Sequence, residues 1–359
     1  VDARRRTASL RVRYLSIDMP ARITDFTPEP RADVLRRRLF TITRDFGLLI
    51  LLTLLAPILA GAALLVDVAR WIVTRRPFMG VRALAFLWVF LAAEMVGVLW
   101  MAAQWVGAGF GLRSRRMISA AWEVQTWWAR TLFITVERLF RLDVVVEDLA
   151  VVRPGPIIAL FRHASIIDNL LPATLLSDQA GLRMRWIIKR ELLTIPALDV
   201  AGKRLPNYFV DRSSQDPSVE LSRIRALAEG LGEDEGVLIY PEGTRFTEAK
   251  RSRAIARLED SAPDLAVRAR TMHYVLPPRT GGVLALLDAG TDVVVCAHEG
   301  LGGFASVADI WSGALMGRVV RVRFWRTPAD EIPLGRDDRI KWLYDQWQRA
   351  DEWIASFKT

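Results

Sequence analysis

The sequence predicts an α/β fold: a largely parallel sheet flanked by helices, preceded by an N-terminal membrane hairpin of two helices. Two observations predict this fold. Two long apolar runs lie within the first 112 residues, and after them short β-like runs alternate with helical stretches. Strands that alternate with helices are typical of a parallel sheet covered on both faces. The chain therefore divides into a basic N-terminal segment (residues 1–45), a membrane helical hairpin (46–112) and an α/β domain (113–359).

The composition excludes several classes of protein. Hydrophobic residues make up 52% and charged residues 25% of the 359 residues, which excludes a disordered chain. The single cysteine, Cys296, excludes a disulfide framework and an all-cysteine metal site. Three histidines, His163, His273 and His298, leave few candidates for a general base. Their wide separation lacks the spacing of metal ligands, so no metal is expected.

Residues 1–45 are rich in arginine and interrupted by prolines, without a clear period. The whole chain has 49 Lys and Arg against 40 Asp and Glu, a formal charge of +9. We expect the N-terminal segment to lie on anionic membrane lipids, whose headgroups attract such clusters. Nucleic acid is the competing partner and is not expected, because the basic residues cluster beside apolar runs and no nucleic-acid motif is present.

The hairpin is predicted from two apolar runs. Residues 46–66 carry no charge, and residues 83–112 carry only Glu94. At about 1.5 Å per residue, a helix over the first run reaches about 31 Å, enough for the hydrocarbon core of a bilayer. The connection 67–82 is short, so the two helices should be antiparallel neighbours. Glu94 is expected either to pair with a nearby arginine or to have a functional role.

Basic residues beside the hairpin predict its orientation. Eight arginines flank its outer ends and four lie in the connection. Because such residues favour the cytoplasmic side, the domain after residue 112 is expected at the cytoplasmic face of the cell membrane. A hairpin that dips into one leaflet would instead put all the basic clusters at one surface, and the sequence leaves this arrangement open. Seven of the 13 tryptophans lie between Trp71 and Trp128, as expected for rings at a membrane interface.

The α/β domain begins with an amphipathic helix predicted over residues 117–139, near the bilayer. Strands and helices alternate after it. The predicted strands are 143–147, 156–161, 185–188, 208–210, 236–240, 292–297 and 319–324, and the predicted helices are 218–231, 282–289 and 336–357. In such sheets the ligand crevice lies at the carboxyl ends of the strands, so we expect the chemistry there.

The first candidate site follows the strand at 156–161. His163 lies in the turn at its carboxyl end, and Ser165-x-x-Asp168 has the form of a capping box that opens a helix. A carboxylate at that position reaches back toward the turn. Asp168 can thus contact one imidazole nitrogen of His163 and leave the other free to accept a proton. The alternative is a helix cap beside an unrelated loop histidine.

Charged residues follow other predicted strand ends as well. The run Pro-Glu-Gly-Thr-Arg at residues 241–245 follows one strand, and a short strand ends in Asp-Arg at residues 211–212. Lys189 and Arg279 follow the same pattern. The guanidinium group is planar and permanently charged, which suits it to phosphate. Together these strand ends predict a cationic site for a phosphorylated ligand.

Taken together, these motifs resemble those of the glycerophospholipid acyltransferase family, of the 1-acylglycerol-3-phosphate acyltransferase type. The family motif His-x4-Asp matches His163 and Asp168, Phe-x-Asp-Arg matches residues 209–212, and Pro-Glu-Gly-Thr-Arg matches residues 241–245 letter for letter. The fourth family motif has a Val-Pro-x-x-Ile character. Here Val-Leu-Pro-Pro-Arg-Thr-Gly-Gly stands in its place at residues 275–282, which looks more like the lysocardiolipin and animal-type lysophosphatidate branch.

The resemblance covers about residue 116 to the end and implies a membrane-bound enzyme. Such an enzyme moves a fatty acyl group from acyl-CoA to the free hydroxyl of a lysophospholipid acceptor, most simply 1-acylglycerol-3-phosphate to give phosphatidic acid. It implies no cofactor beyond acyl-CoA as co-substrate, and an acyl carrier protein is an alternative donor. His163 would be the general base, and Asp168 would orient it. The residues that would bind the substrates are Lys189, Arg212, Glu242, Gly243, Thr244, Arg245 and Arg279.

Three alternatives remain at this point. The acceptor could be another lysophospholipid, such as a lysocardiolipin. A hydrolase that uses Ser165 with His163 is disfavoured, because the chain has no Gly-x-Ser-x-Gly elbow. A lipid-binding membrane scaffold with a degenerate site is disfavoured too, because binding alone does not need the pair of His163 and Asp168.

Overall fold

A seven-stranded sheet forms the centre of the α/β domain, in the strand order β1-β7-β6-β2-β5-β3-β4. The computed structural model describes residues 27–111, 115–210, 217–302, 304 and 307–358. The strands are β1 (Asp143–Glu147), β2 (Ile157–Phe161), β3 (Arg183–Lys189), β4 (Tyr208–Val210), β5 (Glu235–Ile239), β6 (Asp292–Glu299) and β7 (Val319–Thr327). The run from β6 to β4 is parallel, and β7 pairs antiparallel with β6. The prediction of a largely parallel sheet is therefore confirmed.

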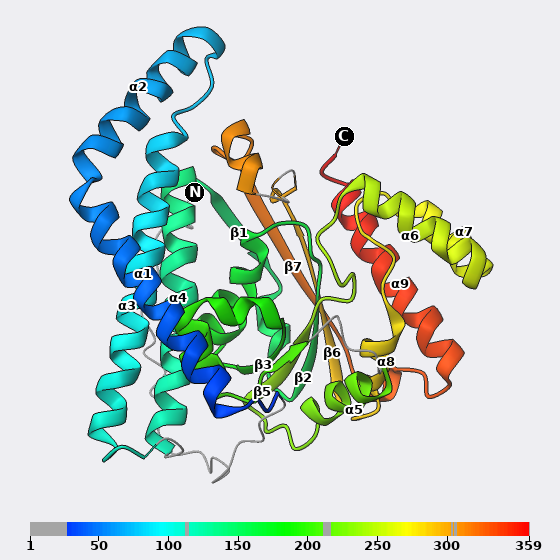
Figure 1. Cartoon of the computed structure of the whole chain (residues 1–359). Coiled ribbons are helices and arrows are strands. Elements are labelled where there is room, and N and C mark those ends of the chain that lie inside the picture. The colour runs from blue at the N-terminus through cyan, green and yellow to red at the C-terminus, as the bar shows by residue number, and fades with distance from the viewer. Residues whose placement is uncertain (1–26, 112–114, 211–216, 303, 305–306, 359) are drawn as a thin grey trace.

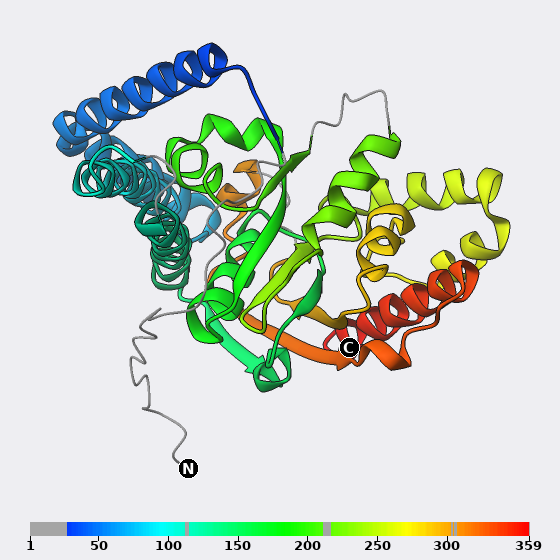
Figure 2. The same cartoon turned by 90° about the horizontal axis from the view of Figure 1, so that it is seen from below.

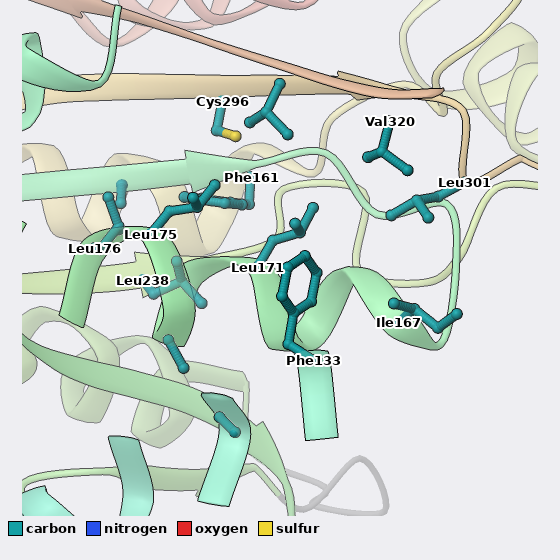
Figure 3. Close-up of a cluster of buried hydrophobic side chains, with 14 of the residues drawn as sticks. Phe133, Phe161, Ile167, Leu171, Leu175, Leu176, Leu238, Cys296, Leu301 and Val320 are labelled. Atoms are coloured by element: carbon teal, nitrogen blue, oxygen red, sulfur yellow. The ribbon is translucent and has the colours of Figure 1, made fainter. Parts of the chain in front are cut away.

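Helices cover both faces of this sheet, as the alternation predicts (Figures 1 and 2). On one face lie α4 and two short helical segments, η2 and η3; on the other lie α5, α8 and α9. Their bounds are α4 (Arg115–Phe140), η2 (Ile167–Leu170), η3 (Ala173–Gln179), α5 (Pro217–Leu227), α8 (Thr280–Leu287) and α9 (Arg336–Ala355). Figure 3 shows the core on the α4 face, where Phe133 lies beside Leu171 in the same cluster as the strand residues Phe161 and Leu238. Cys296 is fully buried in this core, as its apolar strand predicts.

Two of the α-helices in the described residues were not predicted. The structure adds α6 (Glu248–Ser261) and α7 (Pro263–Thr271) between β5 and α8. Only Ile255 of α6 is buried, so the segment lacks the apolar stripe on which a helix prediction depends. Both figures place α6 and α7 at the end of the molecule opposite the N-terminal helices (Figures 1 and 2).

The prediction of one helix over residues 46–66 is wrong. Helix α1 (Arg31–Leu54) and helix α2 (Ala56–Thr74) divide that run and meet at Leu55. Pro57 lies just after the junction, and a proline has no amide hydrogen to donate to the previous turn and crowds its carbonyl group. Helix α3 (Gly80–Gly107) then returns beside α1 and α2 as the expected antiparallel neighbour (Figure 1).

Residues 31–45, the second part of the predicted lipid-binding segment, are helical. Two of their arginines contact the protein itself. Arg37 and Arg38 pair with Asp199, whose side chain is fully buried, at nitrogen–oxygen distances of 3.0 and 3.1 Å. Arg37 also pairs with Glu29 at 2.8 Å. These two guanidinium groups therefore dock α1 on the domain instead of meeting lipid phosphates. The same expectation for residues 1–26 lies outside the described residues.

No arginine among the residues that the structure describes forms an ion pair with Glu94; such a pair was one of the two alternatives that the sequence left open. It is fully buried in α3 and accepts hydrogen bonds from the Trp128 indole nitrogen at 2.6 Å and the Ala197 amide at 2.7 Å. Trp128 belongs to α4, and Ala197 immediately precedes a short helical segment, Leu198–Gly202. Glu94 thus ties the apolar hairpin to the α/β domain at two points.

The turn of the hairpin also packs on the domain. The Arg70 guanidinium donates to the Trp311 carbonyl at 2.7 Å, and Met79 is buried in the same core as Phe133. A hydrocarbon core about 30 Å thick would separate this turn from the domain if α2 and α3 crossed a bilayer. The structure therefore favours a hairpin that enters one leaflet, the arrangement that the sequence left open. The hairpin's flanking and connecting arginines would then lie at the same membrane surface, so their numbers no longer indicate the orientation of the hairpin.

Exposed apolar side chains on the hairpin support contact with lipid. By length and composition, α2 and α3 are each apolar enough to cross a membrane. On α2, Ile58, Leu65 and Val73 are 69%, 73% and 81% exposed. A continuous apolar surface of this kind is typical of a membrane-binding face rather than of a soluble monomer.

Asp67 offers a test of how the hairpin is held. This residue of α2 is 1% exposed, and its carboxylate accepts hydrogen bonds from the amides of Met79, Gly80 and Val81 at the start of α3. Loss of such a cap costs about 1–2 kcal/mol. In micelles, Asp67→Ala should raise the rate of tryptic cleavage after Arg75 roughly 5–30-fold. Asp67→Asn keeps one acceptor and should give an intermediate rate; equal rates in all three proteins would contradict this function of the carboxylate.

Candidate active site

The sheet brings the two strongest sequence motifs together. Strands β2 and β5 are parallel neighbours, with Leu160 opposite Ile239, so the turns after them share one edge. His163 follows β2, and its amide donates to the Glu242 carboxylate at 2.8 Å. The amide of Phe246 in turn donates to the His163 carbonyl at 2.8 Å. The run 241–246 therefore holds the main chain of His163 from both sides.

The predicted contact between His163 and Asp168 is present. The imidazole Nδ1 lies 2.9 Å from Asp168 Oδ1. Asp168 Oδ2 accepts from the amides of Ala164 and Ser165 at 2.6 and 2.7 Å, which is the half of the predicted capping box that Asp168 supplies. Ser165 Oγ accepts from the Ile167 amide at 3.1 Å and not from that of Asp168, and η2 begins after Ile166 without a side-chain cap. Because a carboxylate only accepts hydrogen bonds, Nδ1 carries the hydrogen and Nε2 remains to accept a proton. The His163 side chain is 13% exposed.

His298 is a second histidine at this carboxylate, and the sequence reasoning missed it. Its Nε2 lies 3.1 Å from the Arg162 carbonyl and 3.4 Å from Asp168 Oδ2. The predicted strand ended one residue before it, whereas β6 continues to Glu299. Its position at the carboxyl end of a predicted strand was the signal that could have found it.

Burial and hydrogen bonding set the charges of these groups. Burial alone raises the pKa of Asp168, but hydrogen bonds from His163 and His298 together hold that pKa well below its usual range. Burial lowers the pKa of His298, although the neighbouring carboxylate opposes this. The site therefore contains a charged Asp168 and a neutral His298 at neutral pH, so one negative charge faces the His163 imidazole.

Tyr240 fixes the plane of the His163 ring. The two ring centroids are 4.6 Å apart at an interplanar angle of 37°. The Tyr240 hydroxyl donates to the Asp168 carbonyl at 3.4 Å. The aromatic ring therefore packs on the imidazole while its hydroxyl contacts the segment that carries Asp168. Sequence reasoning treated Tyr240 only as the last residue of a strand.

Glu242 has different partners from those expected. The sequence predicts that it reaches a substrate, but the residue is 2% exposed and both its oxygens accept from main-chain amides, of His163 and of Leu276 at 3.0 Å. Burial raises the pKa of Glu242 to about 8, against the opposing effects of Arg162 and of the two amides. Glu242 thus braces the turns after β2 and β5 to the segment before α8.

The predicted substrate-binding residues lie mostly around the 241–245 turn. Gly243 has a φ of +65°, and a Cβ there would lie 2.9 Å from Arg279 Nε, so a glycine is required under this side chain. Lys250 Nζ donates to Thr244 Oγ1 at 3.1 Å and to the Arg245 carbonyl at 2.9 Å. Arg245 itself is half-buried.

The other two predicted cations lie elsewhere. Lys189 is exposed at the carboxyl end of β3, which pairs with the far side of β5 from β2. Arg212 lies outside the described residues. The structure therefore brings Arg245 and Arg279 together with His163, and it places Lys189 farther along the same edge of the sheet.

A cavity of about 680 Å³ opens beside the turn. Glu242 and Thr244 line it at one end, and α6 and α7 line it at the other. Its walls include four cationic side chains and one acidic side chain. The cationic residues are Lys250, Arg253, Arg257 and Arg279.

Comparisons with known proteins agree with the motifs. A family model described as Acyltransferase matches residues 143–299. The chain is 24% identical over 247 residues to mouse "Lysocardiolipin acyltransferase 1" (65% of this chain, 62% of the relative) and 26% identical over 211 residues to mouse "1-acyl-sn-glycerol-3-phosphate acyltransferase gamma" (56% and 53%). It thus spans about three fifths and about half of these two relatives.

One solved structure is similar in part. The 1-acyl-sn-glycerophosphate acyltransferase PlsC from Thermotoga maritima aligns with a TM-score of 0.48 and 16% sequence identity. The alignment covers 76% of this chain and 98% of that chain.

The charge of Asp168 predicts a pH-dependent stability. Its pKa is lowered from 3.8 in the folded protein, so its contribution to stability is present above about pH 4 and is lost as the pH falls toward the folded value. Asp168→Asn should lower the free energy of unfolding by about 3 kcal/mol at neutral pH. Thermal unfolding between pH 7 and pH 3 should show this difference shrinking below about pH 4.

The exposed Asp330 provides the matched control. Asp330→Asn should leave the unfolding temperature close to that of wild type at each pH. A difference between wild type and Asp168→Asn that stayed constant from pH 7 to pH 3 would contradict the assignment of a buried charge to Asp168.

Proposed function

The chain belongs to the glycerophospholipid acyltransferase family, and from this premise we propose that it transfers a fatty acyl group from acyl-CoA to the free hydroxyl of a lysophospholipid. The acceptor we propose is 1-acylglycerol-3-phosphate, which would give phosphatidic acid. One observation carries the proposal: the buried Asp168 holds Nδ1 of His163, so that Nε2 is left for a proton in a turn bonded to the Arg245-containing run.

In the proposed reaction, His163 acts as general base and then as general acid. Its Nε2 accepts the proton of the acceptor hydroxyl as that oxygen attacks the thioester carbonyl carbon. The tetrahedral intermediate then expels the CoA thiolate, which takes the proton back from His163. Asp168 stabilises the imidazolium that exists between these steps, and Tyr240 keeps the ring in plane.

Direct transfer is favoured over a covalent acyl-enzyme. Ser165 is fully buried, and its hydroxyl oxygen accepts a hydrogen bond from the Ile167 amide rather than facing the His163 imidazole. Cys296 is also fully buried, and burial raises the pKa of its thiol well above the usual range. Neither residue is a suitable nucleophile, which also disfavours the hydrolase alternative.

We propose that the acceptor reaches the site from the membrane that holds the hairpin, on the cytoplasmic face, whose anionic headgroups suit the arginines beside the hairpin. The exposed apolar side chains of α2 support insertion into one leaflet, where a lysophospholipid also resides. Arg245 would then bind the acceptor phosphate close to the glycerol hydroxyl. The relative named as a lysocardiolipin acyltransferase makes lysocardiolipin the second acceptor to test.

The first prediction concerns the base. His163→Ala should reduce acyl transfer from radiolabelled acyl-CoA to lysophosphatidate by about 10²–10⁴-fold, because it removes the proton acceptor. Binding of the lysolipid should remain. His273→Ala is the matched control, since His273 is exposed on the chain segment after α7, and it should retain activity. Full activity in His163→Ala would refute the assignment, and thioester hydrolysis without acylated lipid would identify a hydrolase.

The second prediction concerns the phosphate. Arg245→Ala should raise KM for lysophosphatidate roughly 10–150-fold, the value of a charge-assisted hydrogen bond of about 1.5–3 kcal/mol. KM for acyl-CoA should change less than about twofold, and Arg245→Lys should restore part of the affinity. If only KM for acyl-CoA rose, Arg245 would belong to the donor side.

A further inference from the structure

The basic cavity between α6, α7 and the start of α8 is not explained by the acceptor. An acceptor phosphate is separated from the reacting hydroxyl by only a short glycerol backbone, so it needs cations beside His163. The cavity instead extends from Thr244 along α6 to α7, with a volume of about 680 Å³. This size is typical of a site for a whole organic ligand.

The cations along α6 form a line. Lys250, Arg253 and Arg257 all line the cavity and are spaced by three and four residues, so they lie on one face of the helix. At about 1.5 Å per residue, the line from Lys250 to Arg257 is about 10 Å long. Its first member contacts Thr244, next to the proposed site of acyl transfer. A ligand with charges spread along such a length fits this arrangement better than one with a single phosphate.

Arg253 and Arg257 are not used to stabilise the fold. Both are exposed, and in the part of the chain that the structure describes no carboxylate lies within ion-pair distance of either. Arg253 Nε donates to the Ala249 carbonyl within its own helix at 3.0 Å. Two exposed guanidinium groups are thus available to an anion that enters the cavity.

The location of the cavity indicates a water-soluble ligand. Helices α6 and α7 lie at the end of the molecule opposite the apolar helices α1–α3 (Figures 1 and 2). A phospholipid acceptor keeps its acyl chain in the bilayer and would not extend to this end. The water-soluble part of an acyl donor can extend to this end. Apolar wall residues such as Leu258 and Leu265 offer a surface for a flat ring.

We propose that this cavity binds the 3′-phosphoadenosine diphosphate of coenzyme A, with Arg253 and Arg257 on its phosphate groups. The inference rests on the proposed function and deepens it, because it gives the nucleotide of the proposed donor a binding site. Coenzyme A carries three phosphate groups along a nucleotide, whereas the prosthetic group of an acyl carrier protein carries one. The elongated line of cations favours the nucleotide.

The experiment measures binding to the full chain in micelles by calorimetry, with CoA and adenosine 3′,5′-bisphosphate as probes. The double variant Arg253→Gln, Arg257→Gln should weaken Kd for both probes at least tenfold and raise KM for acyl-CoA similarly. The matched control Arg336→Gln, Lys341→Gln removes two exposed charges from α9 that do not line the cavity. It should change both constants less than twofold.

A donor without the nucleotide separates the two proposals. With an acyl-pantetheine thioester, the double variant should match wild type, because the proposed catalytic residues are intact. Unchanged Kd values in the double variant would overturn the nucleotide site even if acyl transfer proceeds. Binding of adenosine 3′,5′-bisphosphate that depends on the two arginines would support the site even if lysophosphatidate is not acylated. The proposal would also be overturned if the wild-type protein bound neither CoA nor adenosine 3′,5′-bisphosphate but transferred the acyl group from an acyl carrier protein thioester.

Discussion

The site depends on one buried carboxylate. Asp168 is removed from water, which is costly for a charge unless hydrogen bonds replace its hydration. Two amides and the His163 ring donate to it, and His298 lies 3.4 Å from it. This set of donors keeps the carboxylate charged and fixes the hydrogen of His163 on Nδ1. The same carboxylate thus holds the main chain of the turn through the Ala164 and Ser165 amides and determines which nitrogen of the His163 ring is free.

The strand order of the sheet explains why motifs far apart in the sequence meet at one site. Because β5 inserts beside β2, a turn 79 residues later in the chain donates and accepts at the main chain of His163. Glu242 extends this brace to Leu276, in the segment that replaces the fourth family motif. The residues of the Pro-Glu-Gly-Thr-Arg run thus differ in what they do. Glu242 holds neighbouring turns, Gly243 leaves room for Arg279, and Arg245 is half-buried beside them, where we propose that it binds phosphate.

The sequence predicts the sheet well because its strands are short and the central ones, β2, β5 and β6, are buried and apolar, and all seven predicted strands are found. It predicts the contact of His163 and Asp168 because the two residues belong to one turn. The sequence does not predict polar contacts between residues that are far apart in the chain. The docking of Arg37 on Asp199 joins residues 162 positions apart, and the approach of His298 to Asp168 requires β6 to lie beside β2. Such pairs depend on tertiary arrangement, which periodicity does not contain.

The hairpin and the cavity give the molecule two chemically different ends. The hairpin presents apolar side chains and is docked on the domain at its turn by Arg70 and within its length by Glu94. The cavity presents cations and is lined in part by α6 and α7, which lie at the end of the molecule opposite those helices. His163 lies between the two, at the edge where β2 and β5 end. For the two substrates proposed above, an amphiphilic lysophospholipid and a largely polyanionic acyl-CoA, this polarity would let each approach from the phase it prefers. The reacting atoms would then meet where the two routes converge.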